Sequence, residues 1–266
     1  MWFPASLRTW LRNRTPSSVR LFSREIRATL GNRRNRRLPA REVFTRVYAE
    51  QMWGSGPGGF YSGPGSDREA AQPYADFVLD FITRNGIRSV VDLGCGDFRV
   101  GRMIARDSIT YIGVDVVEPL IEDNIRQYGS DTIHFACLDI SADRLPDGDL
   151  CLVREVFQHV SNAEISATLA KLRQYRYVLF TDVQPDMADG YKINKDKVHG
   201  ASSRILHKSF LRLDAPPFNV KNIEMVFETS PPGFRSIPPY DYGFKLRTFL
   251  IKRLPSEPGL AESFNA

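Results

Sequence analysis

Residues 90–97 read VVDLGCGD, an apolar run that passes directly into a Gly-x-Gly turn. The apolar part predicts a buried strand, and a helix is expected after the turn, over residues 99–106. In a parallel sheet, ligands bind at the carboxyl ends of the strands, where a glycine permits positive φ and close approach of the backbone. A Gly-x-Gly turn alone is a weak signal, so the remaining strands must supply the rest of a site.

The chain from residue 89 onward alternates between apolar strands and helices, which is typical of a parallel sheet covered on both faces. Two further strands without a helix between them predict a terminal hairpin. The fold class is therefore α/β, with a Rossmann-like, seven-stranded, mostly parallel sheet. Strands are expected at residues 89–93, 110–114, 132–136, 149–153, 177–181, 223–227 and 244–251, and helices at 99–106, 118–128 and 163–174.

A helix is also expected over residues 42–51, followed by a glycine-rich loop at residues 53–66. Because this loop carries Trp, Phe and Tyr, we interpret it as a shaped loop that covers a site rather than a spacer. Ser66 and Glu69 have the spacing of a capping box, which predicts that a helix begins there. Pro73 is expected to break or restart that helix.

Acidic residues follow the second and third predicted strands. Asp115 closes the second strand, 19 residues after Gly96, where a carboxylate can accept both hydroxyls of a ribose. Asp139 follows the third strand and can accept from an adenine amino group, with Ile140 against the ring. Either acid alone could be a helix cap or a loop residue. Together with the glycine turn, at the ends of three consecutive strands, they favour a nucleoside site.

The nucleoside is not expected to be a dinucleotide. Arg99 stands where that fingerprint has Gly or Ala, and no Gly-Lys-Ser/Thr phosphate cradle occurs. The carboxylates Asp92 and Asp97 suit a cationic sulfonium better than a polyphosphate. These features point to S-adenosylmethionine as the cofactor.

Residues 67–252 resemble class I S-adenosylmethionine-dependent methyltransferases. The resemblance implies a sheet whose last strand is antiparallel and a glycine turn that approaches the methionine moiety. More narrowly, SGPGS (62–66), CGDF (95–98) and LDAPPFN (213–219) are similar to a bacterial group of small methyltransferases whose substrate is unsettled. The cofactor-binding residues are expected to be Asp92, Gly94, Cys95, Gly96, Asp115, Val116, Asp139, Ile140 and Arg154.

The segment after the fourth strand is expected to face the transferred methyl group. Glu155 and His159 are four residues apart, so they would share a face of one helical turn. His159 is a candidate general base, although it could equally pack beside the cofactor. Arg154 could pair either with an acceptor anion or with a neighbouring acid. Methyl transfer needs no base in principle, since in-line positioning and exclusion of water can suffice.

The substrate side of the site is assigned to the glycine-rich loop and to an insertion at residues 182–219. Trp53, Ser66, Asp182 and Gln184 are the expected acceptor-facing residues. No metal is expected, because His199, His207 and Asp182 match no compact ligand motif.

Charge divides the chain into segments. Residues 1–37 contain ten arginines and one acid, so this basic amphipathic arm carries +9, while the remainder carries −4. Three interpretations of the arm stay open. It could contact an anionic membrane surface or an acidic partner, or it could be an organellar transit peptide, which has a similar composition. It could also be a poorly ordered terminus without a partner. The expected domains are the arm (1–37), a helix and lid loop (38–66), the methyltransferase domain (67–254) and a tail (255–266).

Cellular context is predicted from cysteines and apolar runs. Three cysteines cannot all pair, which favours free thiols in a reducing compartment such as the cytoplasm. No apolar run is long enough to span a bilayer. Any membrane association is therefore expected to be peripheral.

The expected function is methyl transfer to oxygen on a small polar metabolite or saccharide. One alternative is a non-catalytic scaffold that binds S-adenosylmethionine at a membrane surface. Another is an RNA methyltransferase that uses the basic arm. Nucleic acid is disfavoured because the body is acidic and because residues 154–157 read REVF, where base methyltransferases carry an Asn/Asp-Pro-Pro-aromatic motif.

Overall fold

The computed structural model describes residues 34–56, 59–186, 190–230 and 243–252. The predicted tail and all but the last four residues of the predicted arm lie outside these ranges. None of the helices in the described ranges combines the length and the apolar character of a membrane span. All three cysteines are free.

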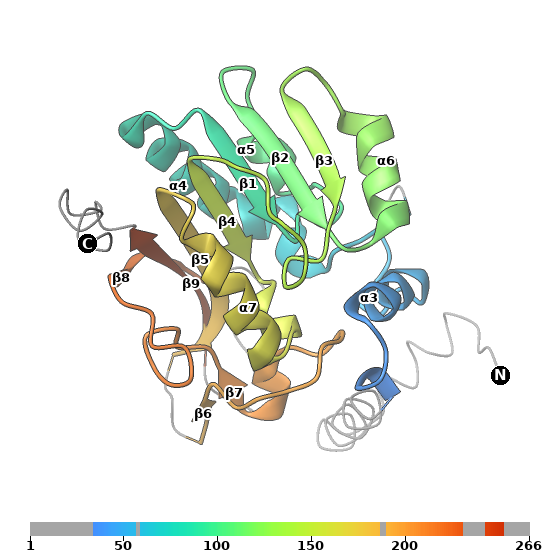
Figure 1. Cartoon of the computed structure of the whole chain (residues 1–266), viewed down its shortest axis with the longest axis vertical. Coiled ribbons are helices and arrows are strands. Elements are labelled where there is room, and N and C mark those ends of the chain that lie inside the picture. The colour runs from blue at the N-terminus through green and yellow to red at the C-terminus, as the bar shows by residue number, and fades with distance from the viewer. Residues whose placement is uncertain (1–33, 57–58, 187–189, 231–242, 253–266) are drawn as a thin grey trace, which may run out of the picture.

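Seven strands form one sheet in the order β3-β2-β1-β4-β5-β9-β8 (Figure 1). The first five pair in parallel, and β9 is antiparallel to both of its neighbours. The predicted Rossmann-like sheet with an antiparallel last strand is thus confirmed. The strands are β1 (Ser89–Leu93), β2 (Thr110–Asp115), β3 (Ile133–Cys137), β4 (Leu150–Arg154), β5 (Tyr177–Pro185), β8 (Ile223–Thr229) and β9 (Phe244–Lys252).

Helices cover both faces of this sheet because successive strand residues point to opposite sides. Val91 of β1 belongs to the core shared with α3 (Ala40–Ala49), α6 (Glu118–Tyr128) and α7 (Asn162–Leu172). Its neighbour Val90 belongs to the core on the other face. That second core is closed by α4 (Arg68–Asn85) and the short α5 (Gly101–Ile104).

Two local predictions about α4 are wrong. The helix begins at Arg68 with Asp67 as N-cap, and Ser66 Oγ donates to the Gly63 carbonyl at 2.7 Å instead of capping it. A capping box is formed instead by Ser161 and Glu164 at the start of α7. Pro73 lies inside α4 without ending it, because the buried apolar stripe that follows continues to pack on the sheet.

The helix predicted over residues 99–106 is reduced to the four residues of α5. Phe98 adopts a φ of +58° with its ring 1% exposed, so the chain is still turning where the helix was expected to begin. Ala105 has already left the helical conformation, with a ψ of 136°. The tight turn after β1 and the burial of this ring therefore take up the first residues of the predicted helix.

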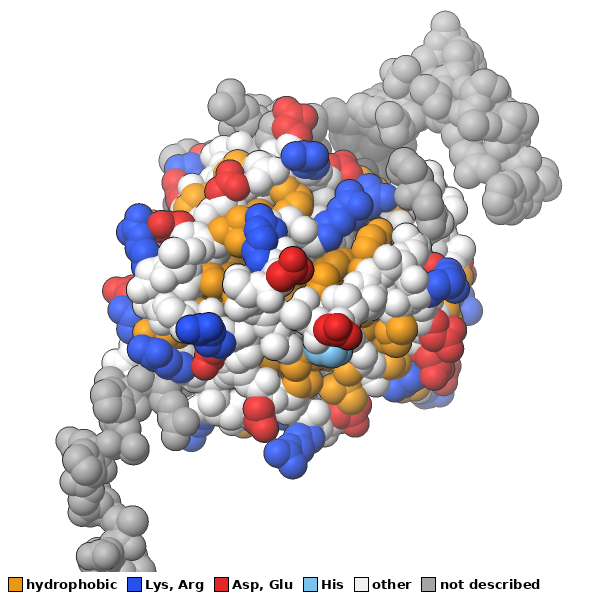
Figure 2. All heavy atoms as spheres, turned by 90° about the horizontal axis from the view of Figure 1, so that it is seen from above, with side chains coloured by type: hydrophobic (Ala, Val, Ile, Leu, Met, Phe, Trp, Pro, Cys, Tyr) orange, Lys and Arg blue, Asp and Glu red, His pale blue; other side chains and the backbone are white. Residues whose placement is uncertain are grey.

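The segment between β5 and β8 carries small elements of its own. The strands β6 (Lys192–Ile193) and β7 (Ser209–Phe210) pair in parallel, with the 3-10 turn η3 (Arg204–His207) just before β7. On the face seen in Figure 2, side chains of both charge signs are interspersed with apolar ones. This mixed pattern differs from the uniform charge of the predicted arm.

Candidate active site

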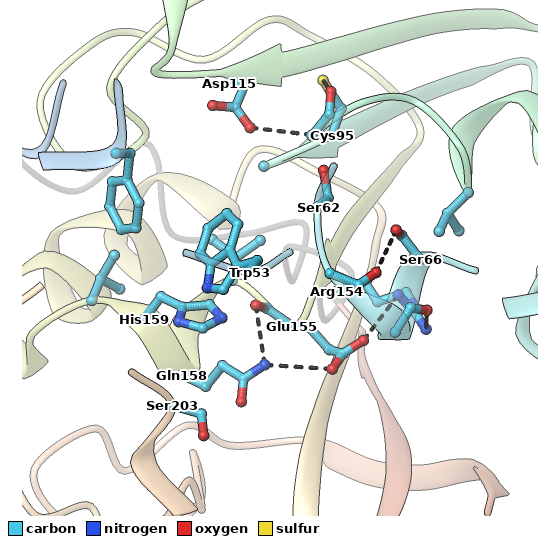
Figure 3. Close-up of a pocket in the computed structure, with 18 of the residues that line it drawn as sticks. Trp53, Ser62, Ser66, Cys95, Asp115, Arg154, Glu155, Gln158, His159 and Ser203 are labelled. Carbon is cyan, nitrogen blue, oxygen red and sulfur yellow. Dashed lines mark hydrogen bonds and ion pairs between the residues drawn. The ribbon is translucent and has the colours of Figure 1, made fainter. Parts of the chain in front are cut away.

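A cavity of about 380 Å³ lies at the carboxyl ends of β1, β2, β3 and β4 (Figure 3). The structure brings together here Gly94, Asp115 and Asp139, which follow three different strands. The lining includes Trp53, Ser66, Asp92, Gly94, Cys95, Gly96, Asp115, Val116, Asp139, Ile140, Arg154, Glu155 and His159, and lacks Asp182 and Gln184.

The glycine turn is folded back onto β2. The amides of Gly94 and Cys95 both donate to the Val114 carbonyl, at 2.7 and 2.9 Å. Gly94 and Gly96 have φ of +75° and +56°. A Cβ on Gly94 would overlap Val156, and one on Gly96 would overlap the Ser62 hydroxyl. The glycines are therefore required by the protein's own packing around the cavity.

Replacing Gly94 by alanine is expected to lower the free energy of unfolding by about 2–4 kcal/mol. The cost of a positive φ in a residue with a Cβ and the cost of the overlap with Val156 add together. Gly86→Ala is the matched control. Gly86 also has a positive φ (+61°), but a Cβ there meets open space, so the cost should be only about 1 kcal/mol. Urea unfolding compares the two variants, and equal losses would rule out the contact with Val156.

The glycine-rich loop is tied to the glycine turn by a reciprocal pair of hydrogen bonds, called here the Ser62–Asp97 bridge. The Ser62 amide donates to Asp97 Oδ2 at 3.1 Å, and the Asp97 amide donates to Ser62 Oγ at 2.9 Å. The Tyr48 hydroxyl of α3 lies 2.9 Å from the same oxygen of Ser62. Arg99 pairs with Asp97 at 2.9 Å. Three segments of the cavity wall are thereby locked together.

Asp115 is held by backbone amides on both sides. Oδ2 accepts from Gly96 at 3.1 Å, and Oδ1 accepts from Val117 at 3.1 Å. Burial raises the pKa of this carboxyl to about 6, although the amide bonds favour its charged form. Asp92 accepts from the Tyr111 hydroxyl at 2.6 Å, and burial raises its pKa to about 6 as well.

Asp139 forms a local turn just beyond β3. Its Oδ1 accepts from the amide of Ser141 at 2.8 Å and from the hydroxyl of Ser141 at 2.6 Å. Ile140 and Leu138 line the cavity beside it. This end of the cavity therefore combines a carboxylate with flat apolar surface, which suits an aromatic base that carries an amino group.

Glu155 and Arg154 form a partly buried ion pair at the opposite end of the cavity. Arg154 Nη1 lies 3.0 Å from Glu155 Oε2, and Arg154 Nη2 donates to the Gly65 carbonyl at 2.9 Å. The guanidinium also lies over the Tyr74 ring. Of the two roles considered for Arg154, pairing with a neighbouring acid is the one observed.

Glu155 and His159 do not share a helical turn, so that prediction is wrong. Glu155 has a φ of +57°, and the 3-10 turn η2 (Phe157–His159) begins only two residues later. The left-handed backbone turns the Glu155 carboxylate toward Gly65, where a Cβ would overlap it. Gln158 Nε2 lies 3.5 Å from Glu155 Oε1.

His159 packs against Trp53, with their ring centroids 5.1 Å apart. The Trp53 indole is fixed by donation to the Ala201 carbonyl at 3.0 Å. Burial, and then the charge of Lys197, lower the pKa of His159 to about 3. The imidazole is therefore neutral at physiological pH and is a weak proton acceptor, which favours a packing role over that of a general base.

The placement of Asp182 and Gln184 on the substrate side is wrong. Strand β5 does not end at residue 181, because β9 pairs with it as far as Pro185. Both side chains are buried, and Gln184 Nε2 donates to the Leu211 carbonyl at 2.9 Å. Between them, Val183 points to the other side and lines the cavity. Burial raises the pKa of Asp182 to about 8.

The two histidines weighed as metal ligands lie against different partners. His199 contacts Glu164 at 2.8 Å and the Leu38 carbonyl at 3.0 Å. His207 lies 3.0 Å from the Ser202 hydroxyl. Within the described ranges, no group of three or more His, Cys, Asp or Glu side chains could hold a metal.

Sequence reasoning missed several lining residues. Phe44 and Tyr48 reach the cavity from α3, for which the sequence predicts a helix but no site residue. The segment around η3 closes the acceptor end, and no spacing in the sequence marks which of its residues do so. The missed residues include Phe44, Tyr48, Ser62, Val156, Gln158, Ala201, Ser203, Ile205 and Leu206.

Comparison with known proteins agrees with this geometry. A family model described as a methyltransferase domain matches residues 90–176. The N-methyltransferase NodS from Bradyrhizobium japonicum, solved with S-adenosyl-l-homocysteine, aligns with a TM-score of 0.51 and 13% identity over 79% of this chain and 98% of that one. No curated protein sequence matches the chain.

A second solved structure is the 1,6-didemethyltoxoflavin-N1-methyltransferase of Burkholderia thailandensis. It aligns with a TM-score of 0.50 and 16% identity, over 80% of this chain and 87% of that one. At these identities the likeness concerns the fold. The domain match adds to it, since residues 90–176 include the strand ends that surround the cavity.

Proposed function

We propose that this class I S-adenosylmethionine-dependent methyltransferase acts on a hydroxyl oxygen of a small polar metabolite or saccharide. The observation that supports this is one cavity with two chemically different ends. Figure 3 shows Asp115 at one end, Glu155, Gln158 and Ser203 at the other, and Trp53 between them.

The residues present fit the cofactor. Asp115 would accept the ribose hydroxyls, and Asp139 would accept from the adenine amino group beside Ile140. The carboxylates of Asp92 and Asp97 favour a cation over a polyphosphate in the same cavity. When bound, the cofactor supplies a methyl group made electrophilic by a sulfonium.

At the acceptor end, Glu155 is the group suited to hold a hydroxyl and take its proton. Oε2 is paired with Arg154, and among the described side chains Oε1 has only the long 3.5 Å contact with Gln158. Trp53 and the neutral His159 form an apolar wall that orients the acceptor and excludes water. Proton transfer to Glu155 and in-line positioning together account for the chemistry.

Cofactor affinity is expected to fall at acidic pH. The pKa of Asp115 is raised to about 6, so the carboxylate that accepts the ribose hydroxyls becomes protonated in the free protein below that pH. Calorimetric titration with S-adenosylhomocysteine should show the dissociation constant rising by up to about tenfold per pH unit below pH ~6. Asp115→Asn should lose the part of this slope that Asp115 contributes, and Asp92, whose pKa is also raised to about 6, supplies the rest. A flat profile between neutral pH and pH ~5 would contradict the proposed contact.

Turnover itself is tested by mass spectrometry of S-adenosylhomocysteine formed with a pool of hydroxylated acceptors. Product formation with sugars or small polyols supports the proposal. Tight cofactor binding without turnover on any acceptor would favour a scaffold instead.

The role proposed for the arm, contact with an anionic membrane surface, is tested by vesicle cosedimentation with and without residues 1–37. An RNA gel shift lost in the same truncation would favour RNA as the partner.

A further inference from the structure

A second groove lies beside the catalytic cavity, between the start of α4 and α5. Ser66 lines both hollows, so the groove and the cavity share a wall at the end of the glycine-rich loop. Four of the seven side chains around the groove are arginines. The lining is Ser66, Arg68, Gln72, Arg99, Arg102, Met103 and Arg106, called here the arginine groove.

Only one of these arginines is neutralised by carboxylates that the structure describes. Arg99 lies 2.9 Å from Asp97 and 3.6 Å from Asp67. Arg68, Arg102 and Arg106 are exposed, and in the described ranges no carboxylate lies within ion-pair distance of them. Three like charges thus line one groove without compensation, which an anion would relieve.

The start of α4 adds to this field. The N-cap residue Asp67 does not cap the helix with its side chain, because Oδ2 accepts from the Tyr61 hydroxyl at 2.9 Å. The positive end of an 18-residue helix is therefore open beside the groove. Glu69 in the first turn and Asp76, which accepts from Gln72 at 2.8 Å, are the nearby acids on this helix.

We propose that the arginine groove binds a phosphate group, and that this phosphate belongs to the methyl acceptor. Guanidinium groups bind phosphate through two parallel hydrogen bonds, and a dianion with three free oxygens can engage several of them at once. A phosphorylated sugar or polyol would rest its phosphate in the groove and extend past Ser66 toward Glu155. The phosphate site stands on its own, whereas its assignment to the acceptor rests on the proposed function.

The phosphate site is tested on the full chain by chemical footprinting. With S-adenosylhomocysteine bound, millimolar inorganic phosphate should slow phenylglyoxal modification of Arg68, Arg102 and Arg106 by about fivefold or more, as mapped by mass spectrometry. Arg84, on the last turn of the same helix and paired with Asp80, is the internal control and should be unaffected. Unchanged modification rates at the three groove arginines would overturn the site.

The acceptor assignment is tested by comparing sugar phosphates with the same sugars lacking phosphate. The phosphorylated forms should give more S-adenosylhomocysteine, and Arg102→Gln with Arg106→Gln should lower kcat/KM for them by about tenfold or more. Arg84→Gln is the matched control. Cofactor affinity should not change in either variant.

The outcomes separate the two proposals. If phosphate protects the groove but only unphosphorylated sugars are methylated, the acceptor assignment fails and the proposed function survives. If protection occurs and no hydroxyl is ever methylated, the proposed function fails and the phosphate site stands. If the groove variants lose binding to phosphatidylglycerol vesicles while sugar phosphates are not methylated, the groove serves a lipid headgroup and the acceptor assignment is overturned.

Discussion

Asp115→Ala is expected to weaken binding of S-adenosylhomocysteine by about 100-fold or more while the protein stays folded. Each hydrogen bond from a ribose hydroxyl to a carboxylate contributes about 1.5–3 kcal/mol, and this side chain is placed to accept two. Its loss also leaves the amides of Gly96 and Val117 without their acceptor, so the glycine turn becomes less ordered. Isothermal titration calorimetry measures the affinity, and thermal unfolding checks the fold.

Asp115→Asn separates the two contributions. The asparagine keeps one oxygen for a backbone amide but cannot accept from both hydroxyls at full strength, so its affinity should lie between wild type and the alanine variant. Asp149 makes a useful second control. It accepts from the amides of Arg88 and Ser89 at the opposite end of the sheet, so Asp149→Asn should leave cofactor affinity unchanged. Wild-type affinity in the Asp115→Ala variant would remove this residue from the cofactor site.

Glu155→Gln is expected to lower kcat by about 10²–10⁴-fold with little change in cofactor affinity. A glutamine keeps the shape of the side chain and can still contact Arg154, but it cannot take the proton from an acceptor hydroxyl. The effect should therefore appear in turnover rather than in binding of S-adenosylhomocysteine. Single-turnover kinetics with an identified acceptor measures it, and thermal unfolding checks that Arg154 is still accommodated.

His159→Asn is the comparison that decides which residue accepts the proton. Because the pKa of His159 is lowered to about 3, its loss should reduce kcat by less than about tenfold, through poorer packing against Trp53. If instead His159→Asn abolishes turnover and Glu155→Gln does not, the roles given to the two residues are reversed. A loss of similar size in both variants would mean that neither acts alone.

The fold could be predicted because its signals are local. Strand β1 and helix α6 begin and end at the predicted residues, since an apolar run before a glycine turn and a helical stripe between two strands each leave a periodic pattern. The parallel pairing of the first five strands followed from their alternation with helices, whereas the order of the strands in the sheet was not predicted. Errors were confined to places where packing overrides propensity, such as the continuation of α4 through Pro73.

Only the site residues that directly follow a strand could be predicted from the sequence. Asp115 and Asp139 follow strands of a parallel sheet, so their shared location follows from topology. The left-handed backbone of Glu155 could not be predicted from the sequence, because a positive φ is usually found at glycine or asparagine and not at glutamate. Asp182 and Gln184 were misplaced because the length of β5 is set by its distant partner β9.

The Ser62–Asp97 bridge separates two parts of the cavity wall. The glycine turn on one side of it belongs to the cofactor end, and the loop that leads from Trp53 to Ser62 on the other side could be exchanged. The described residues between Trp53 and Ser62 lie in a loop. Two hydrogen bonds hold the Ser62 end of this loop to the glycine turn. A designer who wished to change acceptor choice could therefore transplant this stretch from another enzyme and retain the serine as a splice point. Cofactor recognition would be inherited intact by the resulting chimera.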